Sequence, residues 1–290
     1  MCNFSCEYCP DYLHDGAVGF PKYDDAIWFI KELSREKPDL FIEILGGETT
    51  LWPKMISFIN EVAEINPNIL VEVNTNGSRT RNWWKRFAES NTQKNSVLNF
   101  SYHAAFCDPD LYYDNLKTVA DAGYAVASNF MLDPPYFDKV KDLWERTADL
   151  PIGASIKLLR PGFDSHKLID GYTPEMLDYI VKTNMDDRQS GVQTNWDINV
   201  YADGELINWQ ERVIQKQHSF KFWYCSAGSR RFHVNLFGDI RPCSELIFAK
   251  EEKYLLGNIF KRNFKPYEDL IVCPADYCPC KIDAICYKHD

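Results

Sequence analysis

The first ten residues, MCNFSCEYCP, place three cysteines, Cys2, Cys6 and Cys9, at the spacing C-x3-C-x2-C. Three thiols this close together favour a metal centre over disulfide bonds, because the N-terminus lacks the charged-then-apolar pattern of a secretory signal. Three ligands leave such a centre one ligand short. An open coordination position is typical of a reactive metal site, whereas a structural site closes its ligand set.

Zinc is the alternative to an iron-sulfur centre at this N-terminus. Zinc sites usually combine two C-x2-C pairs, or add histidine ligands later in the chain. Only Cys6 and Cys9 form such a pair here. The spacing therefore favours a cluster held by three thiolates.

This stretch resembles the motif of the radical SAM enzymes, C-x3-C-x-aromatic-C, with Tyr8 in the aromatic position. The resemblance implies a 4Fe-4S cluster bound by Cys2, Cys6 and Cys9, with S-adenosylmethionine (SAM) on the open iron. It implies that the reduced cluster cleaves SAM to a 5'-deoxyadenosyl radical, which abstracts hydrogen from a substrate. An electron donor such as flavodoxin or ferredoxin follows from the same chemistry. No catalytic side chain is assigned.

The composition describes an ordinary globular protein. The chain has 290 residues, with 45% hydrophobic and 26% charged residues, which is enough for one large domain and a smaller one. A formal net charge of -10 argues against binding nucleic acid through its phosphates. No apolar run is long enough to predict a membrane span, and we expect a cytoplasmic protein.

Short apolar runs with β character alternate with helical patterns up to residue 158. The predicted strands cover residues 40–45, 69–74, 97–102, 124–132 and 152–158, and the predicted helices cover residues 26–33, 53–65, 81–89, 109–122 and 136–147. This alternation predicts an α/β fold with a parallel sheet that curls toward a barrel. The resemblance implies a partial (β/α)6 TIM-like barrel over residues 1–160, and we expect its first strand upstream of Met1.

The pattern changes after the barrel. Residues 161–195 are predicted to be a connector, and residues 196–290 a small hairpin-containing domain. One predicted hairpin turns at Asp203-Gly204, between strands at 198–201 and 205–207, and a second turns at Gly238.

Gly46, Gly47, Glu48 and Thr49 follow the first predicted strand. Glycine lets the backbone come close to a ligand, although a tight turn between strand and helix would explain the same residues. The stretch resembles the GGEP-type motif that contacts the amino group of SAM, with Thr49 in place of proline. The resemblance therefore implies a cofactor contact.

Polar residues end the next two predicted strands. They are Asn74, Thr75 and Asn76 on one and Ser101, Tyr102 and His103 on the other. Barrel sites lie at the carboxyl ends of the strands, so we expect Asn76, Ser101 and His103 to contact SAM or substrate. The alternatives are a turn at Asn76 and a solvent-facing strand end at His103.

The remaining cysteines cluster near the C-terminus. Cys225, Gly238 and Cys243 form C-x12-G-x4-C, and the later group is Cys273, Cys278, Cys280 and Cys286. The pattern resembles the SPASM and twitch domains of radical SAM enzymes, which implies an auxiliary 4Fe-4S cluster. We expect Cys225 and Cys243 to bind it with two of the later four, Cys278 and Cys280 first. A zinc site with four cysteine ligands is the alternative.

The sequence therefore predicts a radical SAM enzyme, an oxidoreductase or a modifying enzyme that acts on a small molecule or a peptide. The auxiliary cluster would assist oxidation or bond formation. The rival hypothesis is a non-catalytic iron-sulfur or zinc-binding protein, serving as an electron carrier or a scaffold.

Overall fold

The computed structural model describes residues 1–16, 19–36, 39–91, 94–162, 167–185, 199–202, 205–278 and 286–289. The chain divides into two compact units, Met1–Tyr23 with Ile30–Asp197, and Asp24–Phe29 with Ile198–Asp290. The predicted connector at 161–195 stays a prediction, because much of it lies outside the described ranges.

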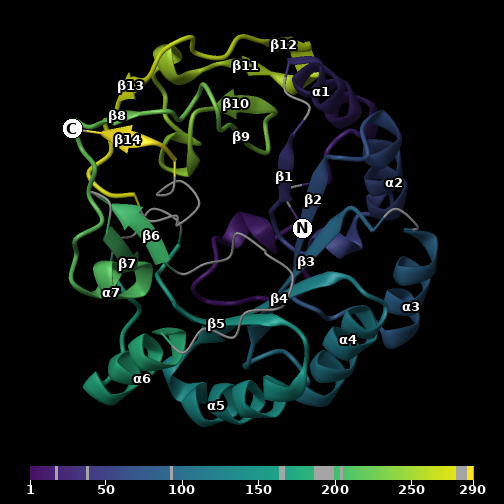
Figure 1. Ribbon diagram of the computed structural model, residues 1–290, viewed down its shortest axis with the longest axis vertical. Helices are drawn as coiled ribbons and strands as arrows, with labels where there is room; N and C mark the ends of the chain where they lie inside the picture. The colour runs from purple at the N-terminus through teal and green to yellow at the C-terminus, as the bar shows by residue number, and fades with distance from the viewer. Residues whose placement is uncertain are drawn as a thin grey trace. The chain divides into compact units, whose positions relative to one another are not determined.

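The first unit is built on one parallel sheet with the strand order β1-β2-β3-β4-β5 (Figure 1). The strands are β1 (Phe41–Ile44), β2 (Leu70–Thr75), β3 (Ser96–His103), β4 (Ala125–Leu132) and β5 (Gly153–Leu158). Neighbouring strands pair in parallel throughout. The predicted α/β fold with a parallel sheet is confirmed, and each predicted strand is present.

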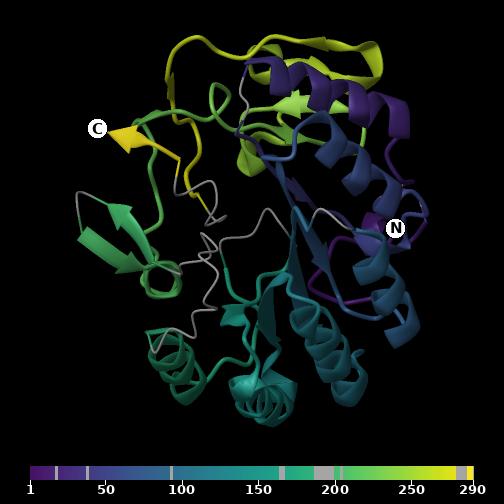
Figure 2. The ribbon, with the colours of Figure 1, turned by 45° about the vertical axis from the view of Figure 1, so that its right-hand side comes forward.

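Helices cross over between the strands and cover one face of the sheet (Figure 2). The connecting helices are α2 (Met55–Ile65), α3 (Arg81–Ser90), α4 (Pro109–Asp121) and α5 (Phe137–Arg146), whereas α1 (Tyr23–Glu36) precedes β1 and α6 (Pro174–Met185) follows β5. The start of α4 follows from its sequence, because the Asp108 carboxylate accepts hydrogen bonds from the backbone N–H groups of Asp110 and Leu111 at 3.0 and 2.8 Å.

The apolar core lies between the sheet and these helices. Phe100 of β3 is fully buried, with its ring centroid 4.8 Å from that of Trp84 and 5.9 Å from that of Tyr112. Tyr102 points the same way and lies 5.0 Å from Tyr112, because alternate residues of a strand face the same side. Tyr102 was expected among the polar strand ends of the site. It belongs instead to the core under the helices.

The opposite face of the same strands is polar. The hydroxyl of Ser155 donates to Asn129 Oδ1 at 2.9 Å, and Asn129 Nδ2 donates to Asn99 Oδ1 at 2.8 Å. Asn99 Nδ2 then donates to Asn74 Oδ1 at 2.7 Å and to Glu72 Oε1 at 2.9 Å. Branched apolar residues usually fill a TIM-type barrel. Here hydrogen-bonded amides and a carboxylate cross four strands, from β5 to β2.

The second unit contains small antiparallel sheets. They comprise β6 (Asn199–Ala202), β7 (Glu205–Asn208), β8 (Tyr224–Cys225), β9 (His233–Val234), β10 (Asp239–Arg241), β11 (Gly257–Asn258), β12 (Asn263–Phe264), β13 (Ile271–Val272) and β14 (Lys288–His289), with α7 (Trp209–Ile214) after β7. The predicted hairpin at Gly238 is confirmed: β9 pairs with β10, and Gly238 has φ +78°. The strands β6 and β7 also pair, and their predicted turn, Asp203-Gly204, lies outside the described residues.

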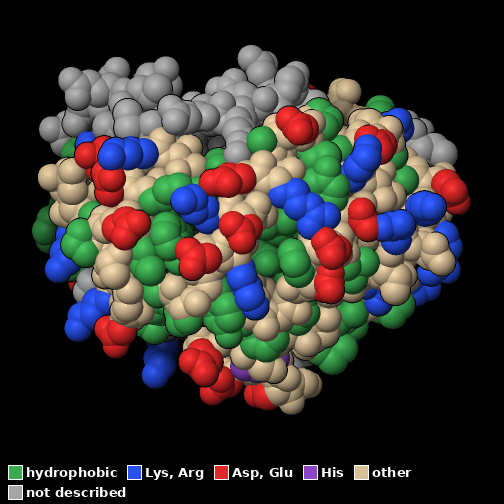
Figure 3. Space-filling model, turned by 90° about the horizontal axis from the view of Figure 1, so that it is seen from below, with side chains coloured by type: hydrophobic (Ala, Val, Ile, Leu, Met, Phe, Trp, Pro, Cys, Tyr) green, Lys and Arg blue, Asp and Glu red, His purple; other side chains and the backbone are tan. Residues whose placement is uncertain are grey.

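Acidic and basic side chains are intermingled on the face shown in Figure 3. Two of the ion pairs of the first unit join neighbouring helices, Arg81 with Asp114 and Arg146 with Asp110. Among the described residues, no helix combines the length and the apolar character that crossing a membrane requires.

We expect Phe100→Ala to lower the free energy of unfolding by about 3–5 kcal/mol, because it leaves a cavity between two helices and the sheet. Leu70→Ala is the matched control, since Leu70 lies on the neighbouring strand and is 46% exposed. Its expected cost is about 1 kcal/mol or less. Urea denaturation followed by circular dichroism measures both, and equal losses would contradict this packing.

Candidate cluster and cofactor site

Glu48 ties together the ends of β1 and β2. It is only 1% exposed, and its carboxylate accepts hydrogen bonds from Thr50 N and Thr50 Oγ1. It also accepts from Thr75 Oγ1 at 2.7 Å and from Asn76 N at 2.6 Å. A buried carboxylate is costly unless its oxygens are paired. Four donors meet this need, and the strand ends become a rigid edge.

The cysteine loop lies directly against this edge. The backbone N–H of Glu48 donates to the Met1 carbonyl at 2.9 Å. A Cβ on Gly47 would collide with that carbonyl and lie 2.7 Å from Cys2 N, so only glycine allows this approach. Asn76 Nδ2 lies 3.9 Å from Cys2 Sγ. The predicted cluster motif, glycine turn and strand end therefore meet in one place.

The other residues of the turn have local roles. Gly46 has φ +145°, a conformation that favours glycine. Thr49 is 7% exposed, and its hydroxyl donates to the Asn74 carbonyl at 2.5 Å. The residue in the place of the expected proline thus ties the turn to β2. A contact between this turn and SAM stays a prediction.

His103 stands at the end of β3 and faces the cysteine loop. Its Nδ1 lies 2.6 Å from the Tyr8 hydroxyl oxygen and 3.6 Å from Cys6 Sγ. Within the loop, Cys9 N donates to the Cys6 carbonyl at 3.0 Å. Ser101 lies on the same side of β3, two residues earlier, because side chains alternate along a strand. The structure thus brings Tyr8 and His103 to one thiol of the motif.

The three thiols differ in their electrostatic environment. A hydrogen bond from Cys9 and a further one from His103 outweigh burial and lower the pKa of Cys6 to about 4. The same bond between the two cysteines, together with burial, raises the pKa of Cys9. Burial raises the pKa of Cys2. Of the three thiols, Cys6 therefore loses its proton most readily, and the thiolate is the form that binds metal.

Three soft sulfur donors on one loop suit an iron-sulfur cluster. Among the described Cys, His, Asp and Glu residues, no group of three is close enough to hold a single metal ion. The donor set at Cys2, Cys6 and Cys9 agrees with a cluster that leaves one iron open. The close approach at Gly47 and the polar neighbours Asn76 and His103 fit the same reading.

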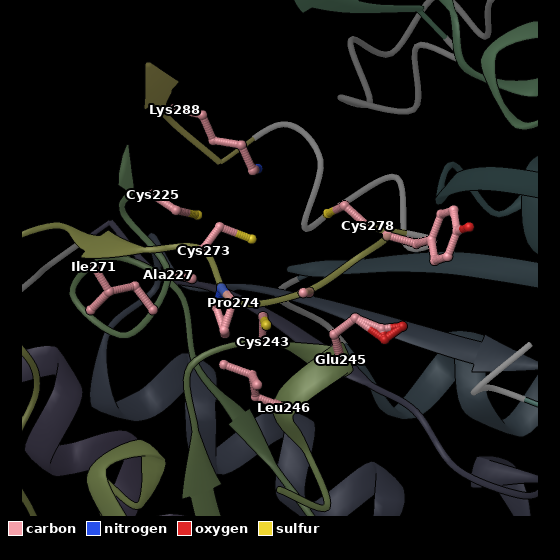
Figure 4. A pocket seen from close by; sticks show the side chains of 12 residues that line it. Cys225, Ala227, Cys243, Glu245, Leu246, Ile271, Cys273, Pro274, Cys278 and Lys288 are labelled. Atoms are coloured by element: carbon pink, nitrogen blue, oxygen red, sulfur yellow. The ribbon is translucent and has the colours of Figure 1, made fainter. Parts of the chain in front are cut away.

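A second group of thiols lies in the C-terminal unit. Cys225 of β8 is opposite Ile271 of β13, which brings Cys273 beside it, and Cys243 follows β10. One pocket is lined by four cysteines, namely Cys225, Cys243, Cys273 and Cys278. Figure 4 shows Cys225 and Cys273 on one side of this pocket and Cys278 on the other.

Charged side chains also reach the pocket. Lys288 of β14 and Glu245 line it with the cysteines. Burial raises the pKa of the Cys273 thiol, and the nearby Cys225 raises it further, whereas Lys288 lowers it. The ammonium of Lys288 would therefore favour thiolates in this pocket.

The later cysteines are placed unequally. Cys286 is described, but it does not line the pocket. Cys280 lies outside the described residues. Cys278 and Cys273 are thus the members of the later group that the pocket brings together with Cys225 and Cys243. No disulfide bond joins any two of the described cysteines.

Residues 1–114 match the family model described as the radical SAM superfamily. This part of the chain is therefore similar to radical SAM domains. A match to this family implies a 4Fe-4S cluster and SAM, and the residues that would hold them stay a prediction. No curated protein matches the chain.

Solved structures share the fold over most of this chain. SuiB of Streptococcus suis is 15% identical with a TM-score of 0.58, over 90% of this chain and 61% of SuiB. The structure of SuiB bound to the precursor peptide SuiA is 14% identical with a TM-score of 0.58, and the match covers 90% of this chain and 61% of SuiB. The structure of SuiB bound to S-adenosylmethionine is 16% identical with a TM-score of 0.57, and the match covers 90% of this chain and 61% of SuiB. At these identities the likeness shows the fold alone, and this chain spans 61% of the length of SuiB.

Sequence reasoning named the strand ends but missed the polar row behind them. Glu72, Asn99, Asn129 and Ser155 lie inside predicted strands, where polar residues were not considered for the site. The available signal was alternation, because polar residues recur at every second position of the strand at 99, 101 and 103. Such alternation indicates a strand with one apolar and one polar face.

We expect Gly47→Ala to lose iron from the N-terminal site, because the added Cβ would push the Met1 carbonyl and Cys2 away from the turn. Iron per chain after anaerobic reconstitution measures the effect. Gly19→Ala is the matched control, since a Cβ there meets no atom within 4 Å. Full iron content in Gly47→Ala would show that the close approach is unnecessary.

Proposed function

We propose that this protein is a radical SAM enzyme that oxidises a polar substrate, a small molecule or a peptide, with the help of an auxiliary 4Fe-4S cluster. The observation that carries the proposal is the meeting of the cysteine loop, the glycine turn and the polar strand ends at one edge of the sheet. Cys2, Cys6 and Cys9 would hold the first cluster. When bound, the cluster and SAM supply the 5'-deoxyadenosyl radical that takes a hydrogen atom from the substrate.

The residues around this edge would position SAM. Glu48 keeps the glycine turn and Asn76 fixed relative to the cysteine loop, so that backbone groups at Gly46 and Gly47 face the cofactor. Thr49 locks the same turn onto β2. Ser101 follows on the same edge and is proposed as a contact for SAM or substrate. Electrons would come from a flavodoxin or a ferredoxin.

The polar row on the inner face supports a substrate that forms hydrogen bonds. The hydrogen bonds of this row all run in the same direction, from the Ser155 hydroxyl through the amides of Asn129 and Asn99 to Glu72. The carboxylate at the end of the row fixes this direction, because it can only accept. These groups bond to one another, and the face that they form is polar, so it suits a polar ligand better than an apolar one. A peptide is one such ligand, and a SuiB structure is described as bound to the precursor peptide SuiA.

The four thiols of the C-terminal pocket support an auxiliary cluster bound by Cys225, Cys243, Cys273 and Cys278. After hydrogen abstraction the substrate is a carbon-centred radical. Held by these four thiolates, a cluster would supply a one-electron acceptor, so that loss of a hydrogen atom, then of one electron and one proton, oxidises the substrate by two electrons. The residues named here differ from the pair expected first, since the pocket offers Cys273 beside Cys278.

The first test is SAM cleavage by the reconstituted protein. We expect about eight iron atoms per chain for two 4Fe-4S clusters, and formation of 5'-deoxyadenosine with dithionite and SAM. Cys6→Ala should abolish this product, because it removes a ligand of the first cluster, whereas Cys286→Ala should retain it. Zinc in place of iron, or iron without SAM cleavage, would favour the rival electron carrier or scaffold.

The second test concerns the auxiliary site. We expect Cys243→Ala and Cys273→Ala to lose about half of the iron while SAM cleavage persists, since each removes one thiolate of the second cluster only. Cys286→Ala is the matched control and should keep about eight iron atoms. An unchanged iron count in Cys243→Ala would contradict the auxiliary cluster.

A further inference from the structure

Two side chains from different parts of the first unit converge on Cys6. His103 Nδ1 lies 3.6 Å from Cys6 Sγ and 2.6 Å from the Tyr8 hydroxyl oxygen. The Tyr8 and His103 rings are stacked: their centroids lie 5.9 Å apart, and the angle between the ring planes is 13°. Phe4 contacts the same imidazole edge-to-face at 6.1 Å. Aromatic neighbours thus hold the imidazole in place beside the thiol.

One ring nitrogen of His103 lies within reach of both the Tyr8 hydroxyl and Cys6 Sγ. A neutral imidazole has one N–H donor and one bare acceptor nitrogen. A thiolate that binds iron can only accept, and the donors in reach are then His103 Nδ1–H and the Tyr8 hydroxyl. Both hydrogen bonds help to lower the pKa of Cys6, after the larger contribution of Cys9 and against burial.

We propose that His103, oriented by Tyr8, donates a hydrogen bond to the Cys6 thiolate of the N-terminal cluster and raises its reduction potential. The inference rests on the proposed function. A donor near a cluster sulfur stabilises the extra negative charge of the reduced state more than the oxidised state. His103 is therefore a positioning residue that acts through Cys6, and this role differs from the direct contact with SAM or substrate predicted for it.

The consequence concerns the first electron transfer. A cluster that is easier to reduce accepts an electron more readily from a flavodoxin or ferredoxin. Tyr8, in the aromatic position of the motif, then contributes a contact that phenylalanine could not make, because its hydroxyl orients the His103 imidazole beside the Cys6 thiolate. Tyr8 and His103 together would raise the reduction potential of the N-terminal cluster.

The test is a redox titration of the reconstituted full chain, followed by electron paramagnetic resonance (EPR). The N-terminal cluster is recognised as the signal that changes when SAM is added, because SAM occupies its open iron. We expect His103→Phe, which keeps a ring but removes the donor, to shift its potential negatively. A tenfold rise in the ratio of oxidised to reduced cluster at a fixed potential corresponds to about 59 mV.

Two further variants separate a hydrogen bond from a packing effect. His103→Asn can place an amide N–H near the position of Nδ1 and should restore most of the potential. Tyr8→Phe keeps the stacked ring and should shift the potential negatively as well. Phe106→Leu is the matched control: Phe106 stacks on Phe4 at 5.3 Å and offers no side-chain donor, so the potential should not change.

The possible outcomes are distinct. If iron and the SAM-sensitive signal are normal but His103→Phe and Tyr8→Phe titrate like the unmodified protein, the inference is wrong and the proposed function stands. If His103→Phe fails to hold the cluster, the potentials of Tyr8→Phe and His103→Asn decide the question. If the unmodified protein shows no SAM-sensitive signal, the proposed function itself is wrong.

Discussion

The site depends on one buried carboxylate. Glu48 accepts four hydrogen bonds from the turn after β1 and from the end of β2, and its own backbone N–H holds the Met1 carbonyl. Hydrogen bonds to a charged group contribute roughly 1.5–3 kcal/mol each, so this group offsets the cost of its burial only while all the donors stay in place. The cysteine loop, the glycine turn and Asn76 are therefore held as a unit.

The sheet separates two kinds of chemistry across one layer of backbone. Phe100 and Tyr102 face the helices and supply apolar packing, whereas Asn99, Ser101 and His103 of the same strand face the opposite side. Alternation of side chains along a strand makes this division possible without any extra element. The same strands thus carry an apolar core on one side and a polar face on the other.

Much of the fold was predictable because its signals are local. Helical and strand patterns alternate clearly, and Asp108 before Pro109 marks the start of α4 by its own hydrogen bonds. Tyr102 ends the predicted strand beside Ser101 and His103, but only the tertiary structure shows that its side chain faces the helices. The row from Glu72 to Ser155 was missed because these residues come together only when four separate strands, β2 to β5, align in register.

The sequence by itself determined the three-cysteine loop, the order of the strands along the chain and the pairing of the two hairpins, since each depends on spacing within a short stretch. Only the tertiary structure decided that His103 reaches Cys6, that Gly47 lies against Met1, and that Cys273 joins Cys225 in one pocket. These contacts join residues far apart in the chain. They arise from strand register and burial, which no local pattern encodes.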